Sequence, residues 1–129
     1  MHTSKERKPE FGNLDNCFFF TMTTHSRQPI FNKPENVTFL RQAFHHTMNV
    51  KPFVLAAISI LPDHLHCIWE IPNVEPPNDR WELITRLVMQ QQPKIRKLWQ
   101  EPSYSHKIID RNDYANHADY IELNPIKLG

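Results

Sequence analysis

Three observations predict an α+β fold for this sequence. The chain has 129 residues, of which 40% are hydrophobic and 22% charged, as is typical of one globular domain with a modest core. Segments with strand and helix patterns follow one another in the order strand, helix, strand, strand, helix, strand. A further helical segment comes last. We therefore expect residues 1–129 to form one domain of the ferredoxin-like βαββαβ type, with an antiparallel sheet and an additional C-terminal helix.

The first half of the chain contains three of the expected strands. Aromatic and β-branched residues at 17–25 predict a strand, and an apolar stripe with a proline near its start predicts a helix at about 34–49. The near-continuous apolar run at 52–61 predicts a central strand. A turn at Pro62 and Asp63 leads into a third strand at 64–71, so these two strands should form a hairpin.

The second half predicts two helices around one short strand. Asp79 can cap the N-terminus of an amphipathic helix, which Pro93 should end or kink. Residues 103–109 predict a short strand at the edge of the sheet. The last helix should end at Asn124, because a residue that precedes a proline is pushed out of the helical conformation.

Two absences indicate the compartment. No segment approaches the roughly 18 consecutive apolar residues that cross a bilayer, and the N-terminal stretch is polar and basic, so we expect a cytoplasmic protein without a membrane partner. The two cysteines, Cys17 and Cys67, lie in apolar strand-like runs. This position favours buried free thiols over a disulfide framework.

Basic residues are concentrated in residues 80–111, although the net charge of the chain is only +1. This segment has seven basic and three acidic side chains, a local charge of +4, which leaves −3 for the rest. It is either a surface for a polyanion or an ordinary solvated helix face. The basic side chains are those of Arg80, Arg86, Lys94, Arg96, Lys97, Lys107 and Arg111.

Two histidines stand one residue apart in the third strand. Because side chains alternate along a strand, Leu65, Cys67 and Trp69 form an apolar core face and His64 and His66 share the opposite face. Their spacing of about 6.5–7 Å along the strand lets both imidazoles bind one divalent cation. The alternative is a pair of ordinary polar-face residues.

The last helix has two faces of interest. Tyr120 and Asn124 are four residues apart and project from one side of the helix. Tyr114, Ala118 and Ile121 form a separate apolar stripe that would dock the helix on the sheet. Tyr120 alone could be a core or rim aromatic residue, and Asn124 could be a helix cap.

In combination, these segments resemble the HUH single-tyrosine transposases, specifically the REP-associated tyrosine transposases. The resemblance covers residues 18–129. It rests, in order, on "FFFTMTTHSRQPIF", "PFVLAAISILPDHLHCIWEIP", "RWELI", "LWQ" and "DYIELNPIKLG". Members of the family cut single-stranded DNA beside short hairpins of repetitive extragenic palindromes (REP). They form a phosphotyrosine bond to the DNA 5′ end and leave a 3′ hydroxyl.

The resemblance implies a role for each candidate residue. His64 and His66 match the cation-binding pair, and Tyr120 matches the nucleophilic tyrosine. Asn124 occupies the place of a third polar metal ligand, for which water or Glu70 is an alternative. Mg²⁺ or Mn²⁺ suits such a ligand set, with Mn²⁺ tolerating imidazole better. A phenol is a weak nucleophile at its usual pKa near 10, so a cation that neutralises the scissile phosphate would make the attack feasible.

The implied partner is single-stranded DNA with a REP-like hairpin, bound by a monomer or a homodimer. The basic segment 80–111 would hold the DNA backbone. Two departures from the family pattern affect the positioning of the substrate: "SYSH" at 103–106 replaces the usual "FWEH", and Thr85 replaces a lysine.

Two other functions compete with that of a DNA-cleaving and strand-transfer enzyme. A non-catalytic module could bind single-stranded nucleic acid, or a DNA hairpin, by stacking bases on exposed aromatic side chains. Base stacking would not require His64, His66 and Tyr120 together. A rolling-circle replication initiator shares the chemistry but usually has further domains.

Overall fold

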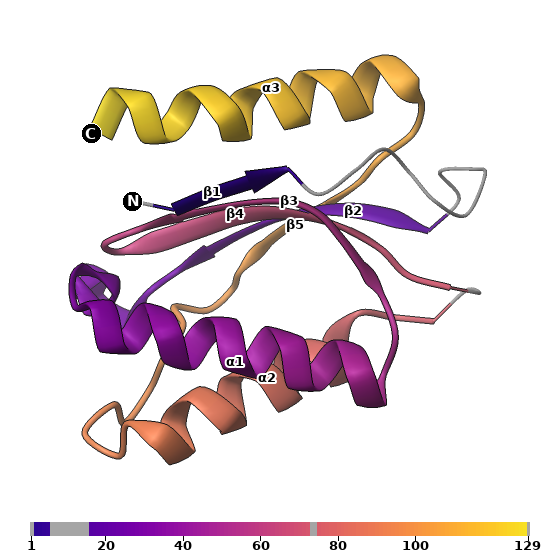
Figure 1. Cartoon of the computed structure of the whole chain (residues 1–129). Helices are drawn as coiled ribbons and strands as arrows, with labels where there is room; N and C mark the ends of the chain where they lie inside the picture. The colour runs from indigo at the N-terminus through magenta and orange to yellow at the C-terminus, as the bar shows by residue number, and fades with distance from the viewer. Residues whose placement is uncertain (1, 6–15, 73–74, 129) are drawn as a thin grey trace.

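The computed structural model describes residues 2–5, 16–72 and 75–128, with side chains described for residues 16–72 and 75–122. One five-stranded sheet lies between two layers of helix (Figure 1). The strands are β1 (His2–Lys5), β2 (Cys17–Thr23), β3 (Val54–Leu61), β4 (His64–Glu70) and β5 (Tyr104–Lys107). The helices are α1 (Pro34–Val50), α2 (Asn78–Gln91) and α3 (Arg111–Leu128), and short 3-10 turns lie at His25–Arg27 and Ile30–Asn32.

The sheet has the strand order β1-β3-β4-β2-β5, and every neighbouring pair is antiparallel. The four strands expected from the sequence are all present, and their order β3-β4-β2-β5 confirms the ferredoxin-like fold. Strand β1 was not predicted. It pairs with the edge of β3, from His2 opposite Ile60 to Lys5 opposite Ala57. Pairing through backbone hydrogen bonds does not require an alternation of apolar side chains, so the sequence carried no signal for this strand.

Two predicted helix boundaries were wrong. Helix α3 continues through Pro125 to Leu128, so Asn124 does not end it. The conformational bias of a residue before proline is a preference, and a proline in the last turns removes one backbone hydrogen bond without stopping the helix. Helix α2 begins at Asn78, so Asp79 lies in its first turn instead of capping it. None of the described helices has an apolar stretch long enough to span a bilayer.

The larger core lies between the sheet and the pair α1 and α2, as the apolar face of β4 predicts. Leu65, Cys67 and Trp69 are fully buried there. The indole rings of Trp69 and Trp81 stack at 4.5 Å, which joins β4 to α2. Cys67 is a buried free thiol, and so is Cys17 on the other face of the sheet. Burial, with the charges of Glu70 and Asp113, raises the pKa of the Cys17 thiol to about 12.

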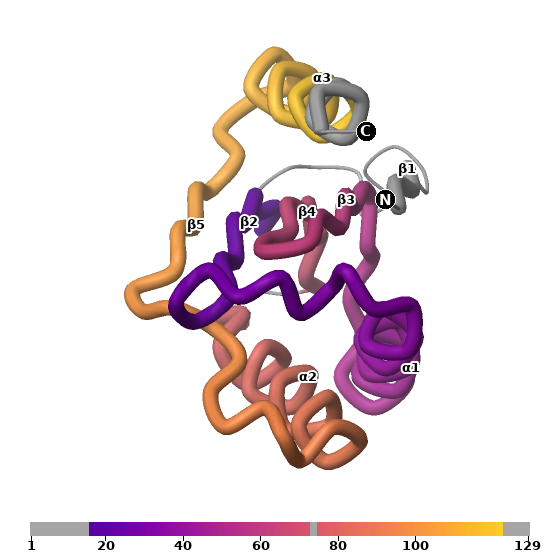
Figure 2. The backbone as a smooth tube through the Cα atoms, turned by 90° about the vertical axis from the view of Figure 1, so that its left-hand side faces the viewer, coloured from indigo at the N-terminus to yellow at the C-terminus, as the bar shows by residue number. Residues whose placement is uncertain are grey.

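Helix α3 covers the opposite face of the sheet, and Figure 2 shows the strands between it and the other two helices. Tyr114, Ala118 and Ile121 pack there on residues of β2, β3 and β4 and on Ile108, which confirms the predicted docking stripe. The sheet is therefore buried on both faces. The histidine-bearing face of β4 is a second core, and His66 is only 4% exposed.

Replacing Ile121 by alanine should weaken the docking of α3. Ile121 is fully buried in the second core, so Ile121→Ala should lower the free energy of unfolding by about 2–4 kcal/mol. Ile109 is 77% exposed and provides the matched control, since Ile109→Ala should change that energy by less than about 0.5 kcal/mol. Urea unfolding measures both variants, and equal effects would contradict the packing of α3 on the sheet.

Candidate functional site

The docking of α3 brings Tyr120 over the histidine pair of β4. The ring centroids of His64 and His66 are 4.9 Å apart, and the ring of Tyr120 lies 5.1 Å from that of His66, nearly perpendicular to it. The Tyr120 side chain is 46% exposed and open to a large substrate. The structure thus brings together three of the four residues predicted for catalysis and metal binding. The side chain of the fourth, Asn124, lies outside the described residues.

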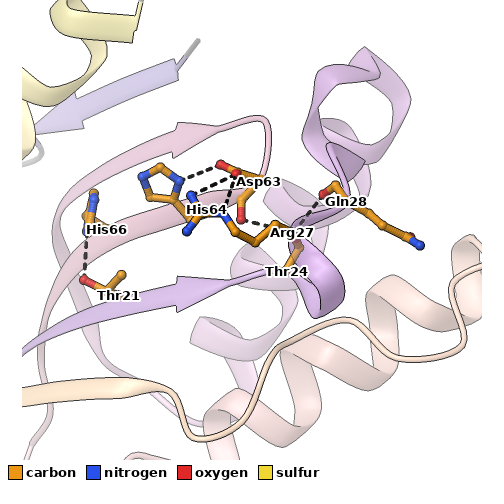
Figure 3. Close-up of polar contacts among 7 residues, drawn as sticks. All are labelled: Thr21, Thr24, Arg27, Gln28, Asp63, His64 and His66. Carbon is orange, nitrogen blue, oxygen red and sulfur yellow. Dashed lines mark hydrogen bonds and ion pairs between the residues drawn. The ribbon is translucent and has the colours of Figure 1, made fainter.

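The imidazole of His66 is held by a side chain of the neighbouring strand β2. Its Nδ1 lies 2.9 Å from the hydroxyl oxygen of Thr21, while its Nε2 is buried with no hydrogen-bond partner among the described residues (Figure 3). A buried N–H without an acceptor is costly, so the favoured tautomer carries the proton on Nδ1 and donates it to Thr21. The Nε2 lone pair then remains available for an outside ligand.

The environment also keeps His66 neutral. Burial, followed by the charge of the neighbouring His64, lowers the pKa of His66 from 6.5 to about 4. At neutral pH the ring is therefore uncharged. A neutral imidazole with its second nitrogen hydrogen-bonded is the form that binds metal ions.

His64 is oriented by the residue before it. Its Nδ1 lies 2.8 Å from Oδ1 of Asp63. The other carboxylate oxygen accepts a hydrogen bond from Nε of Arg27 at 3.1 Å and forms an ion pair with Nη2 of Arg27 at 3.0 Å (Figure 3). Burial opposes ionisation of Asp63, but the bonds from His64 and Arg27 outweigh it and hold the pKa of this carboxyl below its usual value. A carboxylate on one imidazole nitrogen directs the other nitrogen toward a metal.

Arg27 reaches Asp63 from an unusual backbone conformation. Ser26 and Arg27 have φ angles of 55° and 51°, in the left-handed region that non-glycine residues seldom adopt. Thr24 stabilises this turn, because its hydroxyl donates to the carbonyl of Gln28 at 2.7 Å and its backbone N–H donates to the carbonyl of Asp63 at 2.9 Å. Sequence reasoning treated Asp63 only as a turn residue. Its position directly before His64 was the missed signal.

A groove beside α2 gathers part of the basic segment. Its volume is about 760 Å³, and its charged lining consists of Arg86, Arg96 and Lys97 with Glu82 and Glu101, which leaves a small positive excess. On its floor, Nε1 of Trp99 donates a hydrogen bond to Oγ1 of Thr85 at 3.0 Å. Thr85 is one of the two departures from the family pattern, and it ties the segment after α2 to that helix. Three more of the predicted basic residues are exposed elsewhere: Lys94, Lys107 and Arg111.

Arg80 does not belong to a DNA-binding surface, contrary to the prediction. Its side chain is buried, and its guanidinium donates to the carbonyls of Lys51 and Pro52 and to Oε1 of Glu75 at 2.8 Å. Arg80 therefore fastens the start of α2 to the end of α1. A count of basic residues could not distinguish a buried arginine from a solvated one.

A second cluster of possible metal ligands lies near the start of α3. His106, Asp113 and His117 form the only trio of His, Cys, Asp or Glu side chains within metal-binding distance among the described residues, so Glu70 completes no such trio with the histidine pair. Asp113 lies 2.8 Å from Nε2 of His106, and it accepts a bond from the backbone N–H of Ile109.

The hydrogen bonds within this cluster are those of a helix cap at the N-terminus of α3. Burial opposes ionisation of Asp113, but the bonds from Ile109 and His106 prevail and lower the pKa of its carboxyl. Nδ1 of His117 lies 2.8 Å from the backbone carbonyl of Asp113. The atoms that would bind a metal thus already bond to one another. The cluster, which sequence reasoning missed, joins β5 to the first turn of α3.

Two relatives share about a third of the sequence. The chain is 31% identical over 113 residues to the REP-associated tyrosine transposase of Escherichia coli K12, and the match covers 87% of this chain and 67% of the relative. It is 31% identical over 126 residues to a putative REP-associated tyrosine transposase of Haemophilus influenzae, covering 87% and 71%. No protein-family model matches the chain.

Solved structures agree with these relatives. A REP-associated tyrosine transposase bound to a REP hairpin superimposes with a TM-score of 0.80 at 28% identity, over 96% of this chain and 74% of the other. A putative transposase from Deinococcus radiodurans has a TM-score of 0.60 at 15% identity, over 91% and 96%, and shows the fold alone.

Acid should destabilise the metal-free protein through His66. Its folded pKa of about 4 lies below the unfolded value of 6.5, so between these pH values only the unfolded chain takes up the proton. The free energy of unfolding should therefore fall as the pH drops through this window, by on the order of 3 kcal/mol from this group.

Urea unfolding at pH 7.5 and pH 4.5, with a chelator present, measures this loss. His66→Gln should remove most of it, whereas His45→Gln, at an exposed position on α1, should leave it unchanged. If both variants keep the acid sensitivity of the wild type, the burial of His66 is not its cause.

Proposed function

The chain belongs to the REP-associated tyrosine transposases, and from this premise we propose that it is a metal-dependent nuclease and strand transferase for single-stranded DNA beside REP-like hairpins. One observation carries the proposal. The exposed ring of Tyr120 lies 5.1 Å from that of His66, whose buried Nε2 has no partner among the described residues. A core histidine would be expected to have such a partner, whereas a metal ligand would not.

The histidine pair would hold the divalent cation, Mg²⁺ or Mn²⁺. Each ring has its Nδ1 engaged, by Thr21 for His66 and by Asp63 for His64, which leaves the two Nε2 atoms as ligands. Asn124 is the proposed third ligand, and water could complete the shell. The cation would neutralise charge on the scissile phosphate and so lower the barrier to attack by an oxygen nucleophile.

Tyr120 would perform the covalent step. Its phenolic oxygen forms a bond to the phosphorus while the bond from phosphorus to the 3′ oxygen breaks, so the 5′ end becomes attached to the protein and the 3′ oxygen leaves as a hydroxyl with the proton given up by the phenol. His66 and the packing of α3 position the ring. In strand transfer, a second 3′ hydroxyl reverses the same bond exchange.

The basic groove beside α2 would hold the DNA hairpin. Arg86, Arg96 and Lys97 line it and form no ion pair with the described residues, so their charges are available to phosphate groups. A solved relative is bound to a REP hairpin, which supports a hairpin ligand for this chain. The competing function, a hairpin-binding module without catalysis, would use the same groove but would not need Tyr120.

Tyr120→Phe should abolish cleavage and the covalent adduct but leave hairpin affinity within about twofold, because only the nucleophilic oxygen is lost. The assay uses end-labelled single-stranded DNA containing hairpins, with Mn²⁺, and detects the adduct on a denaturing gel. Tyr104→Phe, which removes the hydroxyl of another exposed tyrosine, is the control and should still form the adduct. Wild-type cleavage by Tyr120→Phe would exclude this nucleophile, and the lack of an adduct with the wild type would favour the non-catalytic module.

Hairpin affinity should fall with salt in proportion to the number of phosphates that the groove binds. Replacing Arg96 and Lys97 by glutamine should reduce the slope of log affinity against log salt by about 0.9 for each phosphate that is no longer neutralised. Arg80→Gln should instead lower the melting temperature and leave the slope unchanged, because Arg80 is buried. Fluorescence anisotropy measures the slopes between roughly 50 and 200 mM salt, because protein–DNA complexes weaken over this range. An unchanged slope in the double variant would argue against the groove.

A further inference from the structure

A small hollow opens beside Tyr120 on the α3 side of the sheet. Its volume is about 370 Å³, and its walls come from three elements that are distant in the sequence. Strand β2 provides Phe19 and Thr21, β5 provides Tyr104, and α3 provides Asn116, His117 and Tyr120.

The hollow is built around the ring of Phe19. This ring is buried and meets Tyr104 and Tyr120 edge-on, with both centroids at 6.2 Å and both interplanar angles at 71°, while His117 lies 4.6 Å from it. The two tyrosines are 54% and 46% exposed, which is unusual for large aromatic side chains. Two open aromatic rings therefore flank a buried third one.

The lining indicates a planar, uncharged ligand. No lysine or arginine lines the hollow, so it is not built for a phosphate. Its volume is at the low end of small-molecule sites, which suits one ring system. Tyrosine, phenylalanine and histidine rings are the usual stacking platforms for unpaired nucleobases, and the exposed amide of Asn116 can pair with a base edge.

The position of the hollow indicates where along the DNA strand its base would lie, namely beside the scissile phosphate. Thr21 lines it and also bonds to Nδ1 of His66, so its floor adjoins the proposed metal ligand. Tyr104 lines the hollow, and its neighbour Ser103 lines the basic groove. A strand that leaves a hairpin in the groove would reach the hollow around the edge of β5.

We propose that this hollow is a nucleobase subsite, in which one unpaired base adjoining the scissile phosphate stacks on Tyr104 beside Phe19 and His117. The proposal rests on the proposed function, because the DNA must run past Tyr120. Stacking the base here orients the adjacent phosphate toward Tyr120 and His66. Tyr104 is thus a substrate-binding residue, and Asn116 contributes to the choice of base.

The test uses single-stranded hairpin DNA that carries 2-aminopurine at successive positions around the cleavage site, bound to the Tyr120→Phe protein so that no turnover occurs. Fluorescence should be quenched at one position by stacking on Tyr104. Tyr104→Ala should abolish this quenching, and Tyr104→Phe should retain it. Val50→Ala, at a position equally exposed at 54% but on α1, should have no effect.

A double-mutant cycle, with one change in the protein and the other in the DNA, completes the test. Removing the base at the quenched position, or making Tyr104→Ala, should each weaken binding roughly 5- to 100-fold, and combining them should cost little more, since both remove the same stacking interaction. Additive losses, or quenching that survives in Tyr104→Ala, would overturn the subsite. If either result occurs while adduct formation still depends on Tyr120, the subsite fails and the proposed function stands.

Discussion

The packing of α3 across the second face of the sheet places the candidate nucleophile against the histidine pair, and the candidate site depends on this contact. Tyr114, Ala118 and Ile121 must face the sheet to be buried, and this fixes the rotation of the helix about its axis. Tyr120, next to Ile121, is then at the flank of the helix, in contact with His66 and still open to solvent. The burial of His66, its lowered pKa and its lack of a partner at Nε2 among the described residues all follow from the same packing.

Two sets of polar contacts orient the histidines independently of α3. Thr21 reaches His66 from β2, and the pair Arg27 and Asp63 reaches His64 from the turns at the ends of β2 and β3. Both imidazoles are thereby directed before any ligand arrives, so little conformational entropy is lost when one binds. The left-handed backbone at Ser26 and Arg27 is consistent with this role, because strained residues persist where surrounding bonds hold them and are common at functional sites.

The sequence was sufficient to predict most of the fold and to select the three side chains that the fold brings together, for identifiable reasons. Period-2 alternation in β4 separated Trp69 from His66, and the stripe of Tyr114, Ala118 and Ile121 predicted the docked face of α3. What it could not supply depends on tertiary context: β1 is held by backbone bonds, Arg80 is buried by a contact between two helices, and the trio around Asp113 forms only when β5 meets α3. The family could be recognised from the order and spacing of the motifs, and two relatives with 31% identity confirm it.

The modest contact between α3 and the sheet has a consequence for motion. The larger core, with its stacked tryptophans and two helices, does not include the part of α3 whose side chains are described, where Tyr114, Ala118 and Ile121 are the buried anchors. Lifting the helix from the sheet therefore exposes less apolar surface than global unfolding does and requires less free energy. In such a partly open state the tyrosine and the histidines separate while the rest of the fold persists. Hydrogen exchange would detect this opening as weaker protection of the α3 amides than of the amides in α1 and α2.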